Sequence, residues 1–219
     1  MNRFDPEQSM RRIDAILARA PVVPVLAIAD LEQAVPLARA LVDAGLPVLE
    51  VTLRTPVALE AIRRIHDEVA GAIVGAGTVL TGADLAAVEK AGAAFAISPG
   101  ATDALYAASR ASGVPFLPGV ATAGELMRGI EQGYRRFKFF PAESSGGVAA
   151  LRAFAGPFPQ VKFCPTGGID AARAPSYLAM ANVMTIGGSW MVPGDALAAG
   201  DWTRIAELAG RAAGLRPGA

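Results

Sequence analysis

Short apolar runs alternate with amphipathic stretches along nearly the whole chain, at a spacing of roughly 20 to 25 residues. Eight such runs begin at positions 22, 48, 72, 95, 115, 136, 161 and 183. This alternation predicts β/α units around a parallel sheet, and eight units are the number that closes a (β/α)8 TIM barrel. The alternation also permits an open doubly wound sheet. The count of eight, and the lack of a GxGxxG turn after the first run, favour the barrel.

Residues that commonly begin helices follow several of these runs. Asp30 precedes an amphipathic stretch, and Thr55 is followed by a proline. Thr81 and Thr122 each have an acidic residue three positions later, which is the pattern of a capping box. All four are therefore expected to mark helix starts.

An additional helix is predicted over residues 5–20, ahead of the first strand. Asp5 is placed to cap it, Pro6 suits its first turn, and apolar residues recur at helical spacing behind them. This helix is expected to cover the bottom of the barrel. Since no linker or low-complexity segment divides the chain, residues 1–219 are expected to form one domain.

Composition narrows the possible functions. The chain is 53% hydrophobic, and its 20 basic and 20 acidic residues balance, so no long-range field attracts nucleic acid or an anionic membrane. A single cysteine and a single histidine exclude a disulfide framework and a metal site built from several such residues. The charged N-terminal sequence and the absence of a long apolar run predict a cytoplasmic protein without a membrane span. Neither a cofactor nor a metal is expected.

Side chains alternate along a strand, so their parity predicts which polar residues enter the barrel. In VLEVTLR, the apolar residues pack on the helices, which leaves Glu50, Thr52 and Arg54 on the inner face. In RFKFFPA, the same reasoning sends Lys138 and Phe140 inward. The inward ends of two further strands carry Thr78 and Thr166, and the carboxyl ends of barrel strands are where the functional groups lie.

A lysine inside a barrel has a chemical use. Free lysine has a pKa near 10.4 and is almost wholly protonated at pH 7, whereas burial disfavours the ammonium form. A neutral amine attacks carbonyl groups, and the protonated imine that results favours cleavage of a carbon–carbon bond beside the original ketone. Lys138 is the candidate for this role and Glu50 for moving protons. A structural ion pair is the alternative interpretation, and Lys90 and Lys162 are competing lysines.

Two glycine pairs, in TGGID from 166 and IGGSW from 186, fall at the ends of the last two predicted strands. Backbone N–H groups there can approach a phosphate without obstruction, and Ser189 adds a hydroxyl. Tight turns are the simpler interpretation of either pair alone. Together the two pairs predict a phosphate site. With Lys138 for a ketone and Arg54 at the end of the second strand for a carboxylate, they imply a phosphorylated keto-acid substrate.

The segments EVTLRTP, VGAGTVL, FAISPG, FKFFPAE, FCPTGGI and IGGSW, spread from about residue 22 to 205, resemble those of the 2-keto-3-deoxy-6-phosphogluconate (KDPG) aldolase family. The resemblance implies a class I carbon–carbon lyase of the Entner–Doudoroff pathway that yields pyruvate and glyceraldehyde 3-phosphate. Side activity on 4-hydroxy-2-oxoglutarate and a homotrimer are also implied. The galactonate-series aldolases are similar, but EVTLRTP argues against them. Family members often have basic residues where this chain has Ala29 and Asp30.

The resemblance also implies a role for each candidate residue. It places the Schiff base on Lys138, the proton shuttle on Glu50, and Phe140 beside the imine. Arg54 and Thr78 would hold the pyruvate carboxylate. The remaining residues would serve the aldehyde and phosphate end, namely Thr166, Gly167, Gly168, Gly187, Gly188 and Ser189. Two alternatives stay open, a phosphosugar isomerase or epimerase that uses Glu50 without a covalent adduct, and a catalytically silent barrel that binds metabolites.

Overall fold

Each of the eight apolar runs contains a β-strand, and the fifth contains two. The structure is a computed structural model and describes residues 5–215. Its strands are β1 (Val22–Leu26), β2 (Val48–Thr52), β3 (Ile73–Gly77), β4 (Ala96–Ile97), β5 (Phe116–Leu117), β6 (Gly119–Val120), β7 (Arg136–Phe139), β8 (Lys162–Pro165) and β9 (Ile186–Gly188).

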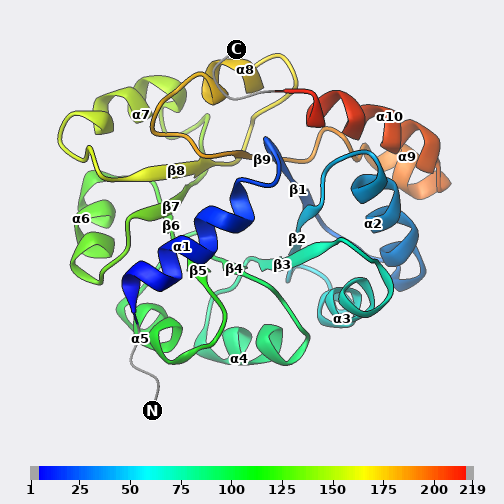
Figure 1. Ribbon diagram of the computed structural model, residues 1–219, viewed down its shortest axis with the longest axis horizontal. Helices are drawn as coiled ribbons and strands as arrows, with labels where there is room; N and C mark the ends of the chain where they lie inside the picture. The colour runs from blue at the N-terminus through cyan, green and yellow to red at the C-terminus, as the bar shows by residue number, and fades with distance from the viewer. Residues whose placement is uncertain (1–4, 216–219) are drawn as a thin grey trace.

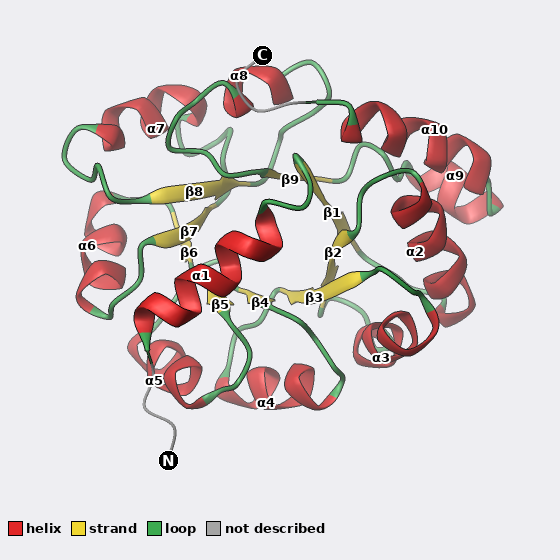
Figure 2. Ribbon diagram, in the orientation of Figure 1, coloured by secondary structure: helices red, strands yellow, loops and turns green. Residues whose placement is uncertain are grey.

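All ladders between these strands are parallel. They form a six-stranded sheet in the order β5-β4-β3-β2-β1-β9 and a three-stranded sheet in the order β6-β7-β8. Pro118 alone separates β5 from β6, and it lacks the N–H that a continuous ladder would use. At the other junction, isolated parallel bridges join Phe163 to Val183 and Thr166 to Gly187. The expected α/β fold with parallel strands is therefore present, and the strands curl around a common interior (Figure 2).

Helices surround the strands on the outside (Figure 1). They are α2 (Ala34–Asp43), α3 (Ala58–Glu68), α4 (Gly82–Lys90), α5 (Asp103–Ala111), α6 (Ala123–Glu131), α7 (Gly147–Ala155), α8 (Ala174–Leu178), α9 (Gly194–Ala199) and α10 (Trp202–Ala213), with a short 3-10 helix η1 (Leu31–Gln33). Alternate residues of β7 pack against this layer. The Phe139 ring lies 6.1 Å from that of Phe154 on α7, as strand parity predicted.

Two of the four expected helix starts are confirmed as capping boxes, at Thr81 and Thr122. Asp30 caps η1 rather than an α-helix, and α2 begins four residues later. The expected start at Thr55 is wrong. The helix α3 begins at Ala58 without a side-chain cap, because the Thr55 hydroxyl donates instead to the backbone carbonyl of Ile28, at 2.6 Å.

The N-terminal helix α1 (Pro6–Leu17) begins at Asp5, whose carboxylate accepts from the N–H groups of Glu7 and Gln8. It lies across one end of the strands in Figure 1. Its carboxylate Asp14 receives two hydrogen bonds, of 2.6 and 2.8 Å, from Arg136 at the start of β7. The helix therefore covers the amino ends of the strands and leaves their carboxyl ends to the loops.

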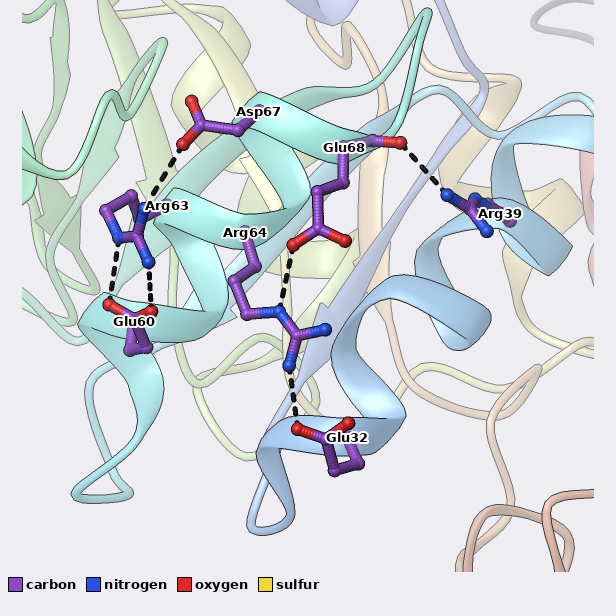
Figure 3. A network of polar contacts seen from close by, with 7 residues as sticks. All are labelled: Glu32, Arg39, Glu60, Arg63, Arg64, Asp67 and Glu68. Carbon is purple, nitrogen blue, oxygen red and sulfur yellow. Dashed lines mark hydrogen bonds and ion pairs between the residues drawn. The ribbon is translucent and has the colours of Figure 1, made fainter.

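A polar network on the surface connects η1, α2 and α3 (Figure 3). Arg64 on α3 binds both Glu68 on its own helix and Glu32 on η1, each at 2.9 Å. Exposed pairs of this kind contribute at most about 1 kcal/mol each. The network fixes the segment after β1 against α3. Among the described helices, none combines the length and the apolar character that a membrane span requires.

Candidate active site

A buried lysine and a buried glutamate meet inside the ring of strands. The Nζ of Lys138, on β7, donates a hydrogen bond of 2.9 Å to Oε1 of Glu50, in the middle of β2. Their side chains are 6% and 1% exposed. These residues are 88 positions apart in sequence. Both point inward because neighbouring positions on each strand pack toward the helices, so strand parity predicted this pair correctly.

The space for the Glu50 carboxylate is provided by a glycine on the adjacent strand. A Cβ atom at Gly77, the last residue of β3, would lie 2.1 Å from Oε1 of Glu50, which is far inside van der Waals contact. An alanine there would therefore displace the carboxylate or the strand. The sequence reasoning missed Gly77, since its role depends on a side chain from β2 reaching across the ladder.

The surroundings of Lys138 distinguish it from the other lysines. The chain contains three, and Lys90 and Lys162 are exposed. The Nζ of Lys138 lies 5.2 Å from the centroid of the Phe140 ring, a cation–π distance. Phe140 itself is partly buried just beyond the end of β7. An amine in this position is shielded from bulk water and contacts one carboxylate and one aromatic ring.

Cys164 lies beside this pair, at the position of β8 that is in register with Lys138. Burial raises the pKa of the Cys164 thiol to about 12, and the nearby Glu50 carboxylate acts in the same direction. The thiol is therefore neutral at physiological pH. Cys164 is therefore a small core residue rather than a nucleophile.

The two glycine pairs predicted to bind phosphate lie next to one another, because Thr166 and Gly187 form a bridge. Thr166 is buried, and a Cβ at Gly187 would lie 2.3 Å from its hydroxyl. Gly167 and Gly168 have φ values of 106° and 78°, which glycine adopts readily. Gly188 leaves room for the ring of Trp190, and Ser189 is exposed. The turn after β8 and the carboxyl end of β9, where Gly187 and Gly188 are buried, thus lie side by side, and we call these two glycine pairs the glycine-lined surface.

The residues expected to hold a carboxylate lie at the ends of β2 and β3. Arg54 is exposed, and its Nε donates to the hydroxyl of Thr52 at 3.0 Å. In the described part of the chain it contacts Thr52 rather than Lys138 or Glu50. Thr78 follows β3 with a φ of 59°, an unusual value for a β-branched residue. Sequence reasoning placed Thr52 on the inner face but did not foresee its contact with Arg54.

All the predicted site residues lie within three residues of the carboxyl end of a strand. The fold and this placement define a class, the parallel α/β enzymes whose reacting groups lie at the carboxyl ends of the strands. Comparison with known proteins then gives the family.

The model of the "KDPG and KHG aldolase" family matches residues 13–208. The KHG/KDPG aldolase of Escherichia coli K12 is 58% identical over 196 residues, which are 90% of this chain and 92% of that protein. A structure of KDPG aldolase from Legionella pneumophila, with pyruvate captured at low pH as a covalent carbinolamine intermediate, is 48% identical with a TM-score of 0.89, covering 91% of this chain and 97% of that one.

The KDPG aldolase of Zymomonas mobilis ZM4, solved with 3-phosphoglycerate, is 49% identical with a TM-score of 0.90, covering 95% of this chain and 99% of that one. The chain belongs to the KDPG and KHG aldolase family, as its sequence motifs predicted.

Proposed function

We propose that this protein is a class I aldolase that cleaves 2-dehydro-3-deoxy-6-phosphogluconate to pyruvate and glyceraldehyde 3-phosphate. The observation that carries the proposal is the buried contact of 2.9 Å between Lys138 and Glu50. A relative of 48% identity holds pyruvate as a covalent carbinolamine, which is an adduct of a carbonyl carbon with an amine. In this chain Lys138 is the lysine that lies inside the ring of strands, and it is the amine assigned to that adduct.

In the proposed reaction, Glu50 takes a proton from the Lys138 ammonium, and the resulting amine attacks the ketone carbon of the substrate while a proton passes from its nitrogen to the ketone oxygen. Glu50 then returns its proton to the carbinolamine hydroxyl, which leaves as water, and a protonated imine remains. Glu50 then removes the proton from the hydroxyl on the second carbon from the imine carbon, and the bond between that hydroxyl-bearing carbon and the carbon next to the imine breaks. The hydroxyl-bearing carbon departs as the aldehyde, and the electron pair of the broken bond converts the protonated imine into an enamine. Protonation of the enamine and hydrolysis of the imine release pyruvate and restore the amine.

The remaining residues are assigned to binding. Arg54 and Thr78 hold the carboxylate of the pyruvate half, Phe140 packs beside the imine, and Thr166 contacts the aldehyde end. The phosphate is assigned to the glycine-lined surface, whose backbone N–H groups suit an anion. The Zymomonas mobilis relative, solved with 3-phosphoglycerate, supports a site for a phosphorylated acid in this family. The phosphate-binding set is Gly167, Gly168, Gly187, Gly188 and Ser189.

A second substrate, 4-hydroxy-2-oxoglutarate, is favoured by the name of the Escherichia coli relative, KHG/KDPG aldolase. Both compounds contain a 2-keto acid with a hydroxyl two carbons from the ketone, so the same lysine chemistry releases pyruvate from each. The shorter substrate carries no phosphate. Its cleavage is therefore expected to be less sensitive to changes in the glycine-lined surface.

The proposal includes the architecture. The proposed architecture is a closed (β/α)8 barrel that forms one domain. Two features support it, namely that Pro118 alone separates β5 from β6, which then count as one strand, and that isolated bridges join the segments of β8 and β9. The single cluster of buried hydrophobic residues, which extends from Ile13 to Ala212, supports one domain. A homotrimer and a cytoplasmic location stay predictions from the sequence. Sedimentation of the purified chain tests the first.

The activity is tested by measuring pyruvate release from each of the two substrates in a coupled dehydrogenase assay. We expect cleavage by the native chain with a chelator present, no cleavage by Lys138→Met, and native rates for Lys162→Met, which changes an exposed lysine. Cleavage by the Lys138→Met variant would refute the imine mechanism. A native chain that releases no pyruvate from either compound would refute the proposed function and favour an isomerase or a binding protein.

A further inference from the structure

Two threonine hydroxyls, at the end of β2 and in the turn that follows, donate hydrogen bonds to the segment leaving β1. Thr52 Oγ1 donates to the carbonyl of Leu26 at 2.8 Å, and Thr55 Oγ1 donates to the carbonyl of Ile28 at 2.6 Å. Both contacts tie the same two segments together. They differ in one respect, since the Thr52 hydroxyl also accepts a hydrogen bond of 3.0 Å from Nε of Arg54.

The Thr52 hydroxyl is a fixed acceptor. It has one proton, which is used on the Leu26 carbonyl, so a lone pair remains for Arg54. The Thr52 residue is 2% exposed, and a β-branched side chain has few rotamers. The direction from which Arg54 can approach is therefore set by buried atoms, although Arg54 itself is exposed.

The other end of the guanidinium is available to a ligand. Among residues 5–215, the hydrogen bond of Arg54 is made by Nε, and Nη1 and Nη2 make no hydrogen bond or ion pair. Arg54 is exposed and lines a cavity of about 280 Å³ with residues of β1, α2 and the segment after β9, and Lys138 and Glu50 are not among the lining residues. An arginine held through Nε presents Nη1 and Nη2 as a planar pair of donors, which matches the two oxygens of a carboxylate.

We propose that Thr52 is a positioning residue for the keto-acid substrate. It holds the guanidinium of Arg54 by Nε, so that Nη1 and Nη2 are already oriented toward the substrate carboxylate before the substrate binds. The inference rests on the proposed function, in which Arg54 binds that carboxylate. Thr52 acts through Arg54 and touches neither the reacting carbon nor Lys138.

The test compares two ketones that differ in the carboxylate. Pyruvate and acetone are each trapped on the protein with borohydride over a range of concentrations. For Thr52→Val, which removes the hydroxyl and keeps the shape, we expect the half-saturating pyruvate concentration to rise at least about tenfold, as loss of one hydrogen bond to a charged group predicts. Trapping of acetone, which lacks the carboxylate, is expected to be unchanged. Thr52→Ser restores the native value for pyruvate.

Thr55→Val is the matched control, because it removes an equivalent hydrogen bond to the segment after β1 without touching Arg54. It is expected to leave pyruvate trapping unchanged. A double-mutant cycle completes the test, since Thr52→Val should have no further effect in an Arg54→Ala background. If the valine variant does not fold, Thr52→Ala takes its place in both measurements.

Three results would overturn the inference. These are equal losses for pyruvate and acetone, an equal loss in Thr55→Val, and independent effects of Thr52 and Arg54 in the cycle. Each would assign Thr52 a structural role only. Failure of the proposed function is recognised separately, because the native chain would then trap neither ketone on Lys138.

Discussion

Because the ion pair between Lys138 and Glu50 is buried, the protein is expected to lose stability when either partner is removed alone. At the observed separation of 2.9 Å, two unit charges attract by about 6 kcal/mol at an effective dielectric constant of about 20. Desolvation of both groups offsets much of this attraction. Removing one partner, however, leaves the other buried and uncompensated, at a cost of about 3–5 kcal/mol. Lys138→Met and Glu50→Leu should each destabilise the protein by an amount in this range.

Replacing both partners should cost much less than the sum of the single changes, because no buried charge then remains. The assay is denaturant unfolding of the native chain, the two single variants and the double variant. The exposed pair Arg11–Glu7 is the matched control. It has the same 2.9 Å separation, but its side chains are 78% and 72% exposed. Arg11→Met should change the free energy of unfolding by less than about 1 kcal/mol.

The reasoning would be refuted if the single variants of Lys138 and Glu50 lost no more stability than Arg11→Met. It would also be refuted if the two losses simply added in the double variant. Either result would mean that water solvates the pair as it solvates the surface pair, and that the enclosed environment needed for the proposed chemistry is lacking.

Three further predictions follow from single contacts. Gly77→Ala places a methyl group 2.1 Å from the Glu50 carboxylate and should slow substrate cleavage by about 100-fold in the coupled assay, as loss of a general base does. The control is Gly210→Ala, whose added methyl group has no neighbouring atom within 4 Å and should not slow cleavage. Burial raises the Cys164 pKa to about 12, so a thiol reagent at pH 8 should react only after unfolding, and fast labelling of the folded chain would contradict this. The free energy of unfolding should also fall as pH rises above about 8.5, because the thiol ionises there in the unfolded chain and not in the folded one. Asp14→Asn removes the carboxylate that fixes α1 over the strands and should speed amide exchange in α1 while leaving the half-saturating pyruvate concentration unchanged.

The strands and the inner pair could be predicted because each depends on a local pattern. Each apolar run of strand length lies between predicted helices, and this local pattern indicates a buried strand. Alternation along β2 and β7 then places Glu50 and Lys138 inside the same ring of strands. The break at Pro118 follows from a missing N–H, although the sequence pattern treated this run as one strand. Thr55 was misassigned because a hydroxyl next to a helix can also donate to another segment. Here the Ile28 carbonyl lies within 2.6 Å, and it took the place of a helix cap.

The finer geometry of the site depends on atoms from different strands, which no pattern in one segment records. Gly77 is needed because the Glu50 side chain on β2 extends across to β3. Nothing in the segment VGAGTV indicates that a long side chain from the neighbouring strand lies against this glycine. The contact of Thr52 with Arg54 joins residues two apart in sequence, but its direction is set by a second hydrogen bond. In that bond the Thr52 hydroxyl donates its proton to the carbonyl of Leu26. The sequence contains no sign of that bond, which depends on the ladder between β1 and β2.

The central claim is that Lys138 forms an imine with the keto acid. The most direct measurement is mass spectrometry of the intact protein after incubation with pyruvate and borohydride, followed by peptide mapping. The account predicts one reduced pyruvate per chain, attached to Lys138. An absence of adduct, or an adduct confined to the exposed Lys90 or Lys162, would contradict it.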